Sequence, residues 1–167
     1  MCIRDRSYGD EIYRHCLAMM GTEAQAADVH QVVFVQAYRD LPRFRGGSSL
    51  RTWLFAIARH RCLDALRAHR RWLRRFVSGV EAPDLSESPR LEEVADAKIR
   101  ARALRKALAE LAPKVRHAVI LRYQEGMSFL EMSDVCGERP KTLQARVARA
   151  MPVLRRHLEA VGVGGAS

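Results

Sequence analysis

Two arginine-rich segments contain the residues of this sequence whose types and spacing could do chemistry, and that chemistry is binding. Residues 43–75 alternate aromatic and basic side chains, beginning with Phe44 and continuing through Trp53 and Arg59. Aromatic rings stack on bases while guanidinium groups contact phosphates, so the pattern is typical of single-stranded nucleic-acid binding. The alternative is that Trp53 and Phe55 simply fill a core between helices. We assign Phe55 to the core and leave Trp53 open between the two roles.

Residues 128–156 have a different pattern, with the proportions of a helix-turn-helix. Ser128 and Glu131 form a capping box at the start of a short helix, and Gly137 marks the turn. Pro140 suits the first position of the helix that follows. Because glutamine pairs with adenine and arginine with guanine, outward-facing polar residues on that helix predict a major-groove reader. An ordinary helical hairpin with a solvated basic face is the alternative.

Catalysis and metal binding have little support in the sequence. His15 beside Cys16, and His60 near Cys62, lie within predicted helices and lack the spacing of a zinc set. Buried thiols and a surface histidine are the expected interpretation. The cysteines are scattered, and no glycine-rich phosphate loop, paired-carboxylate site or nucleophile elbow occurs. We therefore expect a protein that is not an enzyme and that has no metal and no cofactor.

The charge distribution favours a nucleic-acid partner. The 167 residues include 29 Lys and Arg against 19 Asp and Glu, a net charge of +10, and 25 of the basic residues are arginine. Residues 1–76 carry +7, residues 77–98 carry −4 and residues 99–167 carry +7. Guanidinium groups bind phosphate oxygens in pairs, so the two basic blocks suit a polynucleotide. A solvated basic surface is the alternative.

Apolar residues recur at helical spacing throughout, which predicts an all-α fold. Residues 77–98 interrupt the spacing with Ser, Pro and acidic residues, which predicts a flexible acidic linker between two small helical domains. No apolar run approaches the ~20 residues that span a bilayer, and residues 1–7 fit neither a helix pattern nor a signal peptide. We expect a cytoplasmic protein without stable membrane insertion. The expected helices cover about residues 8–20, 22–41, 50–75, 99–111, 114–124, 128–137 and 140–159.

The two arginine-rich segments resemble, in the same order, parts of one protein family. Region 2 of bacterial RNA polymerase sigma factors is similar to AQAADVHQVVFVQAY and LPRFRGGSSLRTWLFAIARHRCLDALR. Region 4 is similar to ALAELAPKVRHAVILRYQEGMSFLEMSDVCGERPKTLQARVARAMPVLRRHL. The short linker is typical of the extracytoplasmic-function (ECF) branch of the sigma-70 family. The resemblance implies a region 2 helical bundle over residues 8–76, a linker over 77–98 and a region 4 helix-turn-helix over 99–159.

The resemblance also implies a function and a set of partners. A sigma factor binds core RNA polymerase and directs initiation at promoters, with region 4 on the −35 duplex and region 2 on the melted −10 element. In this family region 2 captures a flipped base and holds the melted strand. An anti-sigma factor is a further implied partner. The alternative is a stand-alone two-domain helix-turn-helix regulator that no longer docks on the polymerase.

The family's functional positions match three groups of residues in this sequence. The core-polymerase-binding group is Asp28, Gln31, Val32, Phe34, Val35 and Tyr38. The −10 DNA-binding group is Phe44, Arg45, Ser48, Ser49, Thr52, Trp53, Arg59, His60, Arg61 and Arg67. The −35 DNA-binding group is Arg139, Lys141, Thr142, Gln144, Ala145, Arg146 and Arg149.

The sequence departs from the family pattern in both parts of region 2. The acidic residues that usually precede Asp28 and follow Gln31 are Ala27 and Val32 here, which predicts altered docking on the polymerase. His60 replaces a common asparagine, which predicts a different capture of the −10 base.

Region 4 departs from the pattern in the helix that reads DNA. Gln144 and Ala145 stand where a basic residue and a serine are common, which predicts a shifted −35 preference. Pro152 lies in the same helix, where it removes a backbone donor and clashes one turn back. We therefore expect a kink near Ala148 or an early end of this helix.

Overall fold

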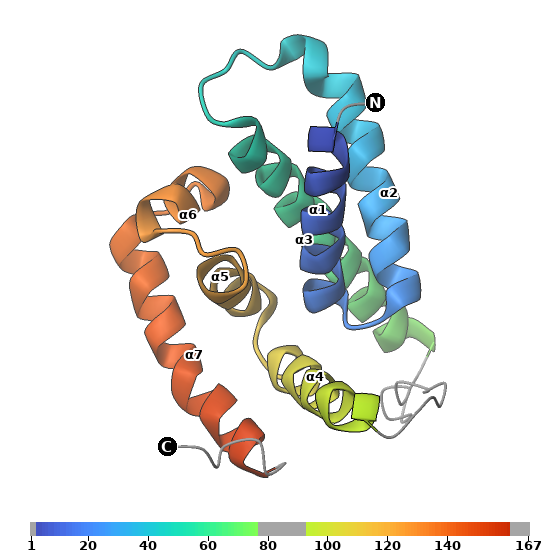
Figure 1. Cartoon of the computed structure of the whole chain (residues 1–167), viewed down its shortest axis with the longest axis vertical. Helices are drawn as coiled ribbons and strands as arrows, with labels where there is room; N and C mark the ends of the chain where they lie inside the picture. Colours follow the sequence, from blue (N-terminus) through green and yellow to red (C-terminus); the bar gives the residue numbers. More distant parts are fainter. Residues whose placement is uncertain (1–2, 77–92, 161–167) are drawn as a thin grey trace.

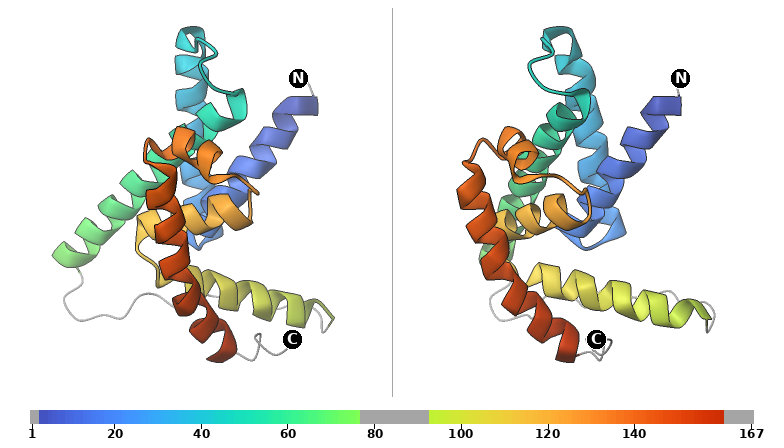
Figure 2. Two further views of the ribbon diagram at one scale, coloured as in Figure 1. Left: turned by 90° about the vertical axis from the view of Figure 1, so that its left-hand side faces the viewer. Right: turned by 60° about the vertical axis from the view of Figure 1, so that its left-hand side comes forward.

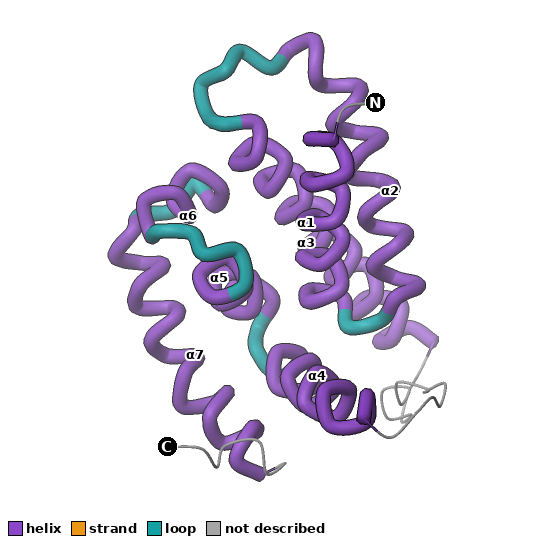
Figure 3. The backbone as a smooth tube through the Cα atoms, viewed as in Figure 1, coloured by secondary structure: helices purple, strands orange, loops and turns teal. Residues whose placement is uncertain are grey.

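The computed structural model describes residues 3–76 and 93–160, which form seven α-helices and one 3₁₀ turn with no β-strand (Figures 1 and 3). The all-α fold predicted from apolar spacing is confirmed. Residues 77–92 of the expected linker lie outside the described residues, whereas residues 93–98 are helical. The elements are α1 (Ile3–Met20), α2 (Glu23–Asp40), η1 (Leu41–Arg43), α3 (Leu50–Phe76), α4 (Glu93–Ala109), α5 (Pro113–Tyr123), α6 (Phe129–Cys136) and α7 (Pro140–Ala160).

Helices α1, α2 and α3 form an antiparallel bundle in the first half of the chain (Figure 1). Thr22 caps α2, because its hydroxyl oxygen accepts a hydrogen bond from the backbone N–H of Gln25 at 3.3 Å. Val33 of α2 and Phe55 of α3 are fully buried at the centre of the bundle. Phe55 is therefore a core residue, as predicted.

Helices α4 to α7 form the second half, and α6 and α7 make the helix-turn-helix. The predicted capping box is present: the backbone N–H of Ser128 donates to Glu131 Oε2 at 2.7 Å, and Glu131 N–H donates to Ser128 Oγ at 3.2 Å. Gly137 ends α6 with φ at 66°, a left-handed conformation that favours glycine. Leu143 and Val147 then fix α7 to the core.

The two halves of the chain pack against each other (Figures 1 and 2). Helix α1 contacts α4 and α5, and α3 contacts α5 and α6. One cluster of buried apolar residues runs through both halves, from Phe55 in α3 to Leu121 in α5. Two regions that are separate in the sequence pattern therefore share a hydrophobic core.

Two helices differ from their expected bounds. Helix α1 begins at Ile3, although residues 1–7 show no helical pattern in the sequence. Helix α7 continues through Pro152 to Ala160, so the expected early end is wrong. Pro152 is exposed while Leu154 is buried, so packing of the inward face holds the helix together past the missing backbone donor.

Candidate nucleic-acid interface

The outward face of α7 presents the predicted −35 residues, apart from Arg139, which lies just before the helix. Six of the seven are exposed, and Arg146 is half-buried. This arrangement follows from helical periodicity, because Leu143 and Val147 occupy the inward face. A hollow on the surface gathers part of the group with one residue of α5; its lining is Val115, Lys141, Thr142, Ala145, Arg146 and Arg149. Short and basic side chains at this end of a helix suit the edges of bases in a major groove.

Arg146 differs from its neighbours because it is already paired. Its Nη1 donates to Glu138 Oε1 at 2.9 Å, and its Nη2 donates to Glu138 Oε2, so the two planar groups pair by two bonds. The hydrogen bond to Arg146 holds the pKa of the Glu138 carboxyl below its ordinary value. Glu138, in the turn before α7, is therefore a charged acceptor beside the predicted DNA-reading helix.

The predicted −10 loop folds back on the start of α3. The Phe44 and Trp53 rings lie 5.0 Å apart between centroids and are tilted by 37°. Both are half-buried, so Trp53 packs against its neighbour and still keeps an accessible face. Ser49 caps α3 by accepting from the Thr52 backbone N–H at 3.0 Å, while Ser48 is half-buried. Ser49 thus defines where the helix starts.

The basic residues further along α3 lie in several different environments. Arg45 in the preceding loop is exposed, as is His60. Arg61 Nε donates to Gln36 Oε1 of α2 at 2.6 Å, which ties it to the bundle. Arg67 and Asp64 form an exposed ion pair at 3.3 Å, a contact of small energy in water. The predicted −10 group therefore includes residues that also support the fold.

Arg59 is the member of this group that reaches the second half of the chain. Its Nη2 lies 3.4 Å from Glu138 Oε1, the oxygen that also accepts from Arg146. The structure thus brings one predicted −10 residue and one predicted −35 residue to the same carboxylate.

The outer face of α2 carries the predicted polymerase-binding residues. Val32, Val35 and Tyr38 are exposed, at 47%, 54% and 84% of their surface. Asp28 and Gln31 are exposed on the same helix. Phe34 is half-buried instead, with its ring 4.9 Å from that of His30. Five of the six residues are accessible to a partner, and three of those five are large apolar or aromatic side chains.

Sequence reasoning missed a network of charged residues between the two halves. Arg51 of α3 donates to Glu11 of α1 at 2.8 Å and lies 3.6 Å from Glu125, just after α5. Arg116 of α5 donates to the backbone carbonyl of Met19 in α1. These contacts join residues far apart in the chain, so the spacing of neighbouring residues could not predict them.

Two buried histidines lie inside this network. The rings of His15 and His117 are 5.1 Å apart and edge to face, and His15 packs in the same way against Phe55 at 5.2 Å. Burial lowers the pKa of His15 to about 3, and burial likewise lowers the pKa of His117 well below its ordinary value. Both imidazoles are therefore neutral near pH 7.

Three thiols are buried within the described residues, those of Cys16, Cys62 and Cys136. Cys16 and Cys62 are fully buried, with their sulfurs 3.9 Å apart. The hydrogen bond between these thiols, together with burial, raises the pKa of Cys62 well above its ordinary value. Within residues 3–76 and 93–160, His, Cys, Asp and Glu side chains nowhere gather in a group of three or more that could hold a metal ion. In the same residues, no helix has the length and hydropathy needed to cross a membrane.

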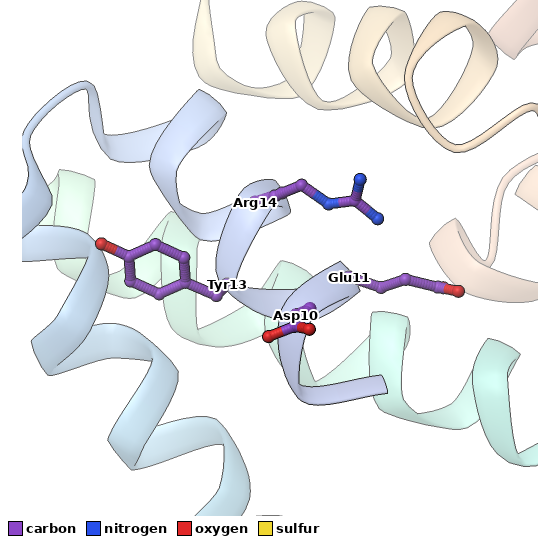
Figure 4. Close-up of a pocket in the computed structure, with 4 residues that line it drawn as sticks. All are labelled: Asp10, Glu11, Tyr13 and Arg14. Carbon is purple, nitrogen blue, oxygen red and sulfur yellow. The ribbon is translucent and has the colours of Figure 1, made fainter. Parts of the chain in front are cut away.

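The side chains that line a hollow on α1 do not point toward a common centre. Figure 4 shows that Asp10, Glu11, Tyr13 and Arg14 line it from one helix, with side chains that point in different directions. Glu11 is moreover paired with Arg51. The candidate binding residues are therefore the basic and aromatic side chains of α3, α7 and the loop before α3 described above.

Comparisons with known proteins agree with this geometry. The Sigma-70 region 2 family matches residues 5–85, and the Sigma-70, region 4 family matches residues 101–151. The ECF RNA polymerase sigma factor SigC of Mycobacterium tuberculosis is 33% identical over 138 residues, which are 83% of this chain and 72% of the relative. SigW of Bacillus subtilis is 25% identical over 158 residues, covering 90% of this chain and 84% of the relative.

Solved structures show the same fold. The sigma factor RpoE of Bartonella quintana, in complex with the anti-sigma factor NepR, superposes with a TM-score of 0.74 at 25% identity. The similarity covers 91% of this chain and 92% of RpoE. CnrH, in complex with the cytosolic domain of CnrY, has a TM-score of 0.59 at 25% identity over 93% of this chain and 90% of CnrH.

A helical bundle with an aromatic–arginine loop, followed by a helix-turn-helix with a basic outer face, defines a DNA-binding protein of transcription. The matches to both regions and to relatives aligned over most of their length identify the type. The chain belongs to the ECF branch of the sigma-70 family, whose members direct promoter-specific transcription as subunits of RNA polymerase. The predicted family and function are confirmed, and a stand-alone regulator is not favoured.

Proposed function

We propose that region 4 of this sigma factor reads the −35 duplex through the outward face of α7, while region 2 holds the melted −10 strand. The exposed row of Lys141, Gln144 and Arg149 on the second helix of a helix-turn-helix is the observation that carries this assignment. A helix so placed enters the major groove with its first turns against the bases. Synthesis of RNA belongs to the core enzyme, and the sigma factor itself catalyses no reaction.

The −10 assignment rests on the aromatic pair. Phe44 and Trp53 keep accessible faces next to exposed Arg45 and His60, so a flipped base could stack there while its phosphates meet the basic groups. Discrimination between bases would follow from the shape of the surface around Phe44 and Trp53 and from the free energy needed to unstack each base.

Docking on the core enzyme is assigned to the outer face of α2. Val32, Val35 and Tyr38 are exposed apolar or aromatic side chains on one face, whereas Ala27 and Val32 lack the carboxylates that the family usually has. Burial of apolar surface, at about 25 cal/mol per Å², would thus take a larger share of docking here than charge pairing does.

A reconstitution tests the whole assignment. The full chain is mixed with core RNA polymerase, and transcripts from a promoter library are sequenced at their starts. The expected result is a set of starts that share one −35 and one −10 element. Binding to DNA with no assembly onto core would instead support the stand-alone regulator.

The docking face has its own test in the same system. Tyr38→Ala should weaken assembly with core about tenfold, because exposed tyrosines often dominate protein interfaces. The matched control is Tyr123→Ala, which removes an exposed tyrosine of α5 outside the assigned face. Equal effects of the two variants would place the core contact elsewhere.

An anti-sigma factor is the further proposed partner. Support comes from two relatives of the same fold, each of which was solved in complex with another protein. One of those proteins is named as an anti-sigma factor. Affinity capture with the full chain from its native cells, followed by a transcription assay with the captured protein, tests the proposal; the protein should suppress initiation.

A further inference from the structure

The C-terminal end of α3 carries aromatic residues to which the proposed function gives no role. His69, Trp72 and Phe76 follow one another at spacings of three and four residues, so they lie on one face of the helix. This aromatic stripe continues the inward face of α3, on which Ala58 and Cys62 are fully buried. His69 is half-buried, whereas Trp72 and Phe76 are 52% and 71% exposed. The end of α3 extends past the other helices in the left-hand view of Figure 2, which leaves the stripe uncovered.

The rings of the aromatic stripe lie in a row, with neighbouring planes tilted only moderately. The centroids of His69 and Trp72 are 6.3 Å apart, with 20° between the ring planes. Those of Trp72 and Phe76 are 5.9 Å apart, with 37° between the planes. Nucleic-acid bases stack on the flat faces of such side chains, whatever the base, because every base has a π face. The stripe therefore offers successive flat surfaces of the kind on which bases stack.

Basic side chains flank the aromatic stripe. Residues 65–76 contain five arginines and no acidic residue, and one of the five is paired with Asp64. The other four are exposed and form no ion pair within residues 3–76 and 93–160; they are Arg70, Arg71, Arg74 and Arg75. A polynucleotide supplies one phosphate and one flat base per unit, which complements a surface of rings and guanidinium groups. Two copies of this surface would instead bring like charges together.

The aromatic stripe is separate from the predicted −10 surface. Trp72 follows Trp53 in the same helix at a distance of about 28 Å along the axis, at ~1.5 Å per residue. One base cannot contact both rings. Binding at the stripe would therefore add contacts to an unpaired strand without changing which base lies at Phe44 and Trp53.

We propose that the aromatic stripe is a second, sequence-independent binding site for single-stranded DNA, in which its rings stack on bases and the flanking arginines contact phosphates. It rests on the proposed function in one respect, namely that the strand comes from the melted promoter. The stripe would retain the unpaired strand without selecting its sequence. Open promoter complexes would thus last longer, while the position of the transcript start would stay the same.

Binding of a fluorescein-labelled, short oligothymidylate to the full chain tests the stacking by fluorescence anisotropy. Trp72→Ala should weaken binding at least about fivefold, which corresponds to about 1 kcal/mol at ~1.4 kcal/mol per tenfold. Trp72→Phe keeps a ring and should bind within about twofold of the wild type, whereas Trp72→Leu keeps only apolar bulk and should behave like Trp72→Ala. Tyr123→Ala removes an exposed tyrosine of α5 and should leave the affinity unchanged. Equal affinities of the wild type and Trp72→Ala would overturn the proposal.

A second measurement detects contact between a base and the ring itself. The sequence contains two tryptophans, so Trp53→Phe leaves Trp72 as the only indole. Saturating oligothymidylate should quench the fluorescence of Trp72 in this variant, because a stacked base lies against the ring. Unchanged Trp72 fluorescence at saturation would overturn the stacking.

The same variants distinguish other partners of the aromatic stripe. The bases of a duplex are already stacked on one another, so Trp72→Ala should bind a duplex as the wild type does; an equal loss on duplex and single strand would overturn base stacking. Binding to phosphatidylglycerol vesicles that depends on Trp72, with unchanged affinity for oligothymidylate, would assign the stripe to a lipid surface. Weaker assembly of Trp72→Ala with core polymerase, again with unchanged oligothymidylate affinity, would assign it to a protein contact. Either result would overturn the proposal.

Transcription by the reconstituted holoenzyme separates this proposal from the proposed function. Trp72→Ala should give the same transcript starts as the wild type, and its open complexes should dissociate faster after a heparin challenge. An unchanged lifetime would overturn the promoter strand as the occupant. Promoter-specific starts combined with oligothymidylate binding that does not depend on Trp72 would overturn the second site alone. Trp72-dependent oligothymidylate binding by a chain that directs no specific starts would overturn the proposed function and leave the second site standing.

Discussion

Arg59 Nη2 lies 3.4 Å from Glu138 Oε1, although 79 positions separate the two residues in the chain. The contact places a residue of the predicted −10 surface against the turn of the helix-turn-helix. It therefore links the two DNA-binding regions through a charged pair whose strength depends on pH, on salt and on competing phosphates.

The first prediction concerns pH. The packing of the two halves of the chain keeps His15 at a pKa of about 3, and separation of the halves would return it toward its ordinary 6.5. Separation is then coupled to proton uptake, so the packed arrangement is favoured fully above about pH 6.5 and loses stability as pH falls toward 3. Each histidine contributes up to about tenfold per pH unit to the ratio of separated to packed protein. His117, with its lowered pKa, acts in the same direction.

The groups around the histidines are consistent with this sign. Glu125 is 3.9 Å from His15, but burial raises its pKa, so its counter-charge weakens in acid. Arg59 and Arg146 add positive charge near His117 and oppose its protonation. Energy transfer between dyes at Ala68→Cys of α3 and Ala148→Cys of α7, both exposed positions, should fall from pH 7.5 to 5.5, and the fall should be smaller in His117→Gln. A pH-independent signal in the wild type would contradict the coupling.

Local chemistry made the helix starts predictable from the sequence. The capping box of Ser128 and Glu131 and the position of Pro140 depend on side chains within a few residues of each helix end. The outward face of α7 was predictable for a similar reason, since helical periodicity places Leu143 inward and Arg149 outward.

Contacts between the regions were not predictable in this way. The residues next to Arg51 and Arg59 in the sequence do not set these two arginines apart from the others of α3. Arg51 nevertheless pairs with Glu125, and Arg59 pairs with Glu138, in the other half of the chain. The periodicity of apolar residues shows which face of a helix is buried, but not which other helix packs against that face. The pattern that favoured DNA binding for Arg59 therefore could not predict its ion pair with Glu138.

A second prediction tests the −35 surface. Arg149 is exposed on the face of α7 that we propose reads DNA, so Arg149→Ala should weaken binding of holoenzyme to the −35 duplex by about 1–3 kcal/mol and relax specificity at one position. Binding to core should not change. Arg155→Ala, an exposed arginine further along the same helix, is the control. Fluorescence anisotropy with labelled duplexes gives both quantities, and a parallel loss of core binding would assign Arg149 to the fold.

The third prediction concerns salt. Arg70 and Arg71 are exposed on α3, beyond Arg67 of the predicted −10 group. If each contacts one phosphate, the double variant Arg70→Ala/Arg71→Ala should reduce the slope of log affinity against log salt by ~0.7–0.9 per residue. Arg100→Ala/Lys106→Ala removes the same charge from exposed positions on α4 and should leave the slope unchanged. Filter binding of open promoter complexes between low and moderate salt measures it. Identical slopes in all three proteins would exclude phosphate contacts at these two arginines.

The fourth prediction concerns Pro152. Proline inside a helix lacks the N–H that would bond to the carbonyl one turn back, and it lowers stability by ~3 kcal/mol relative to alanine in a regular helix. Because Pro152 is exposed while Ala150 and Leu154 are buried, Pro152→Ala changes the backbone without disturbing the core. The variant should raise the free energy of unfolding by about 1–3 kcal/mol in urea titrations followed by circular dichroism. Arg155→Ala, an exposed change of nearly neutral helix propensity, should have little effect. A less stable Pro152→Ala variant would mean that the proline fits the local shape of α7, and that this shape, rather than a regular helix, is the one that the surrounding packing requires.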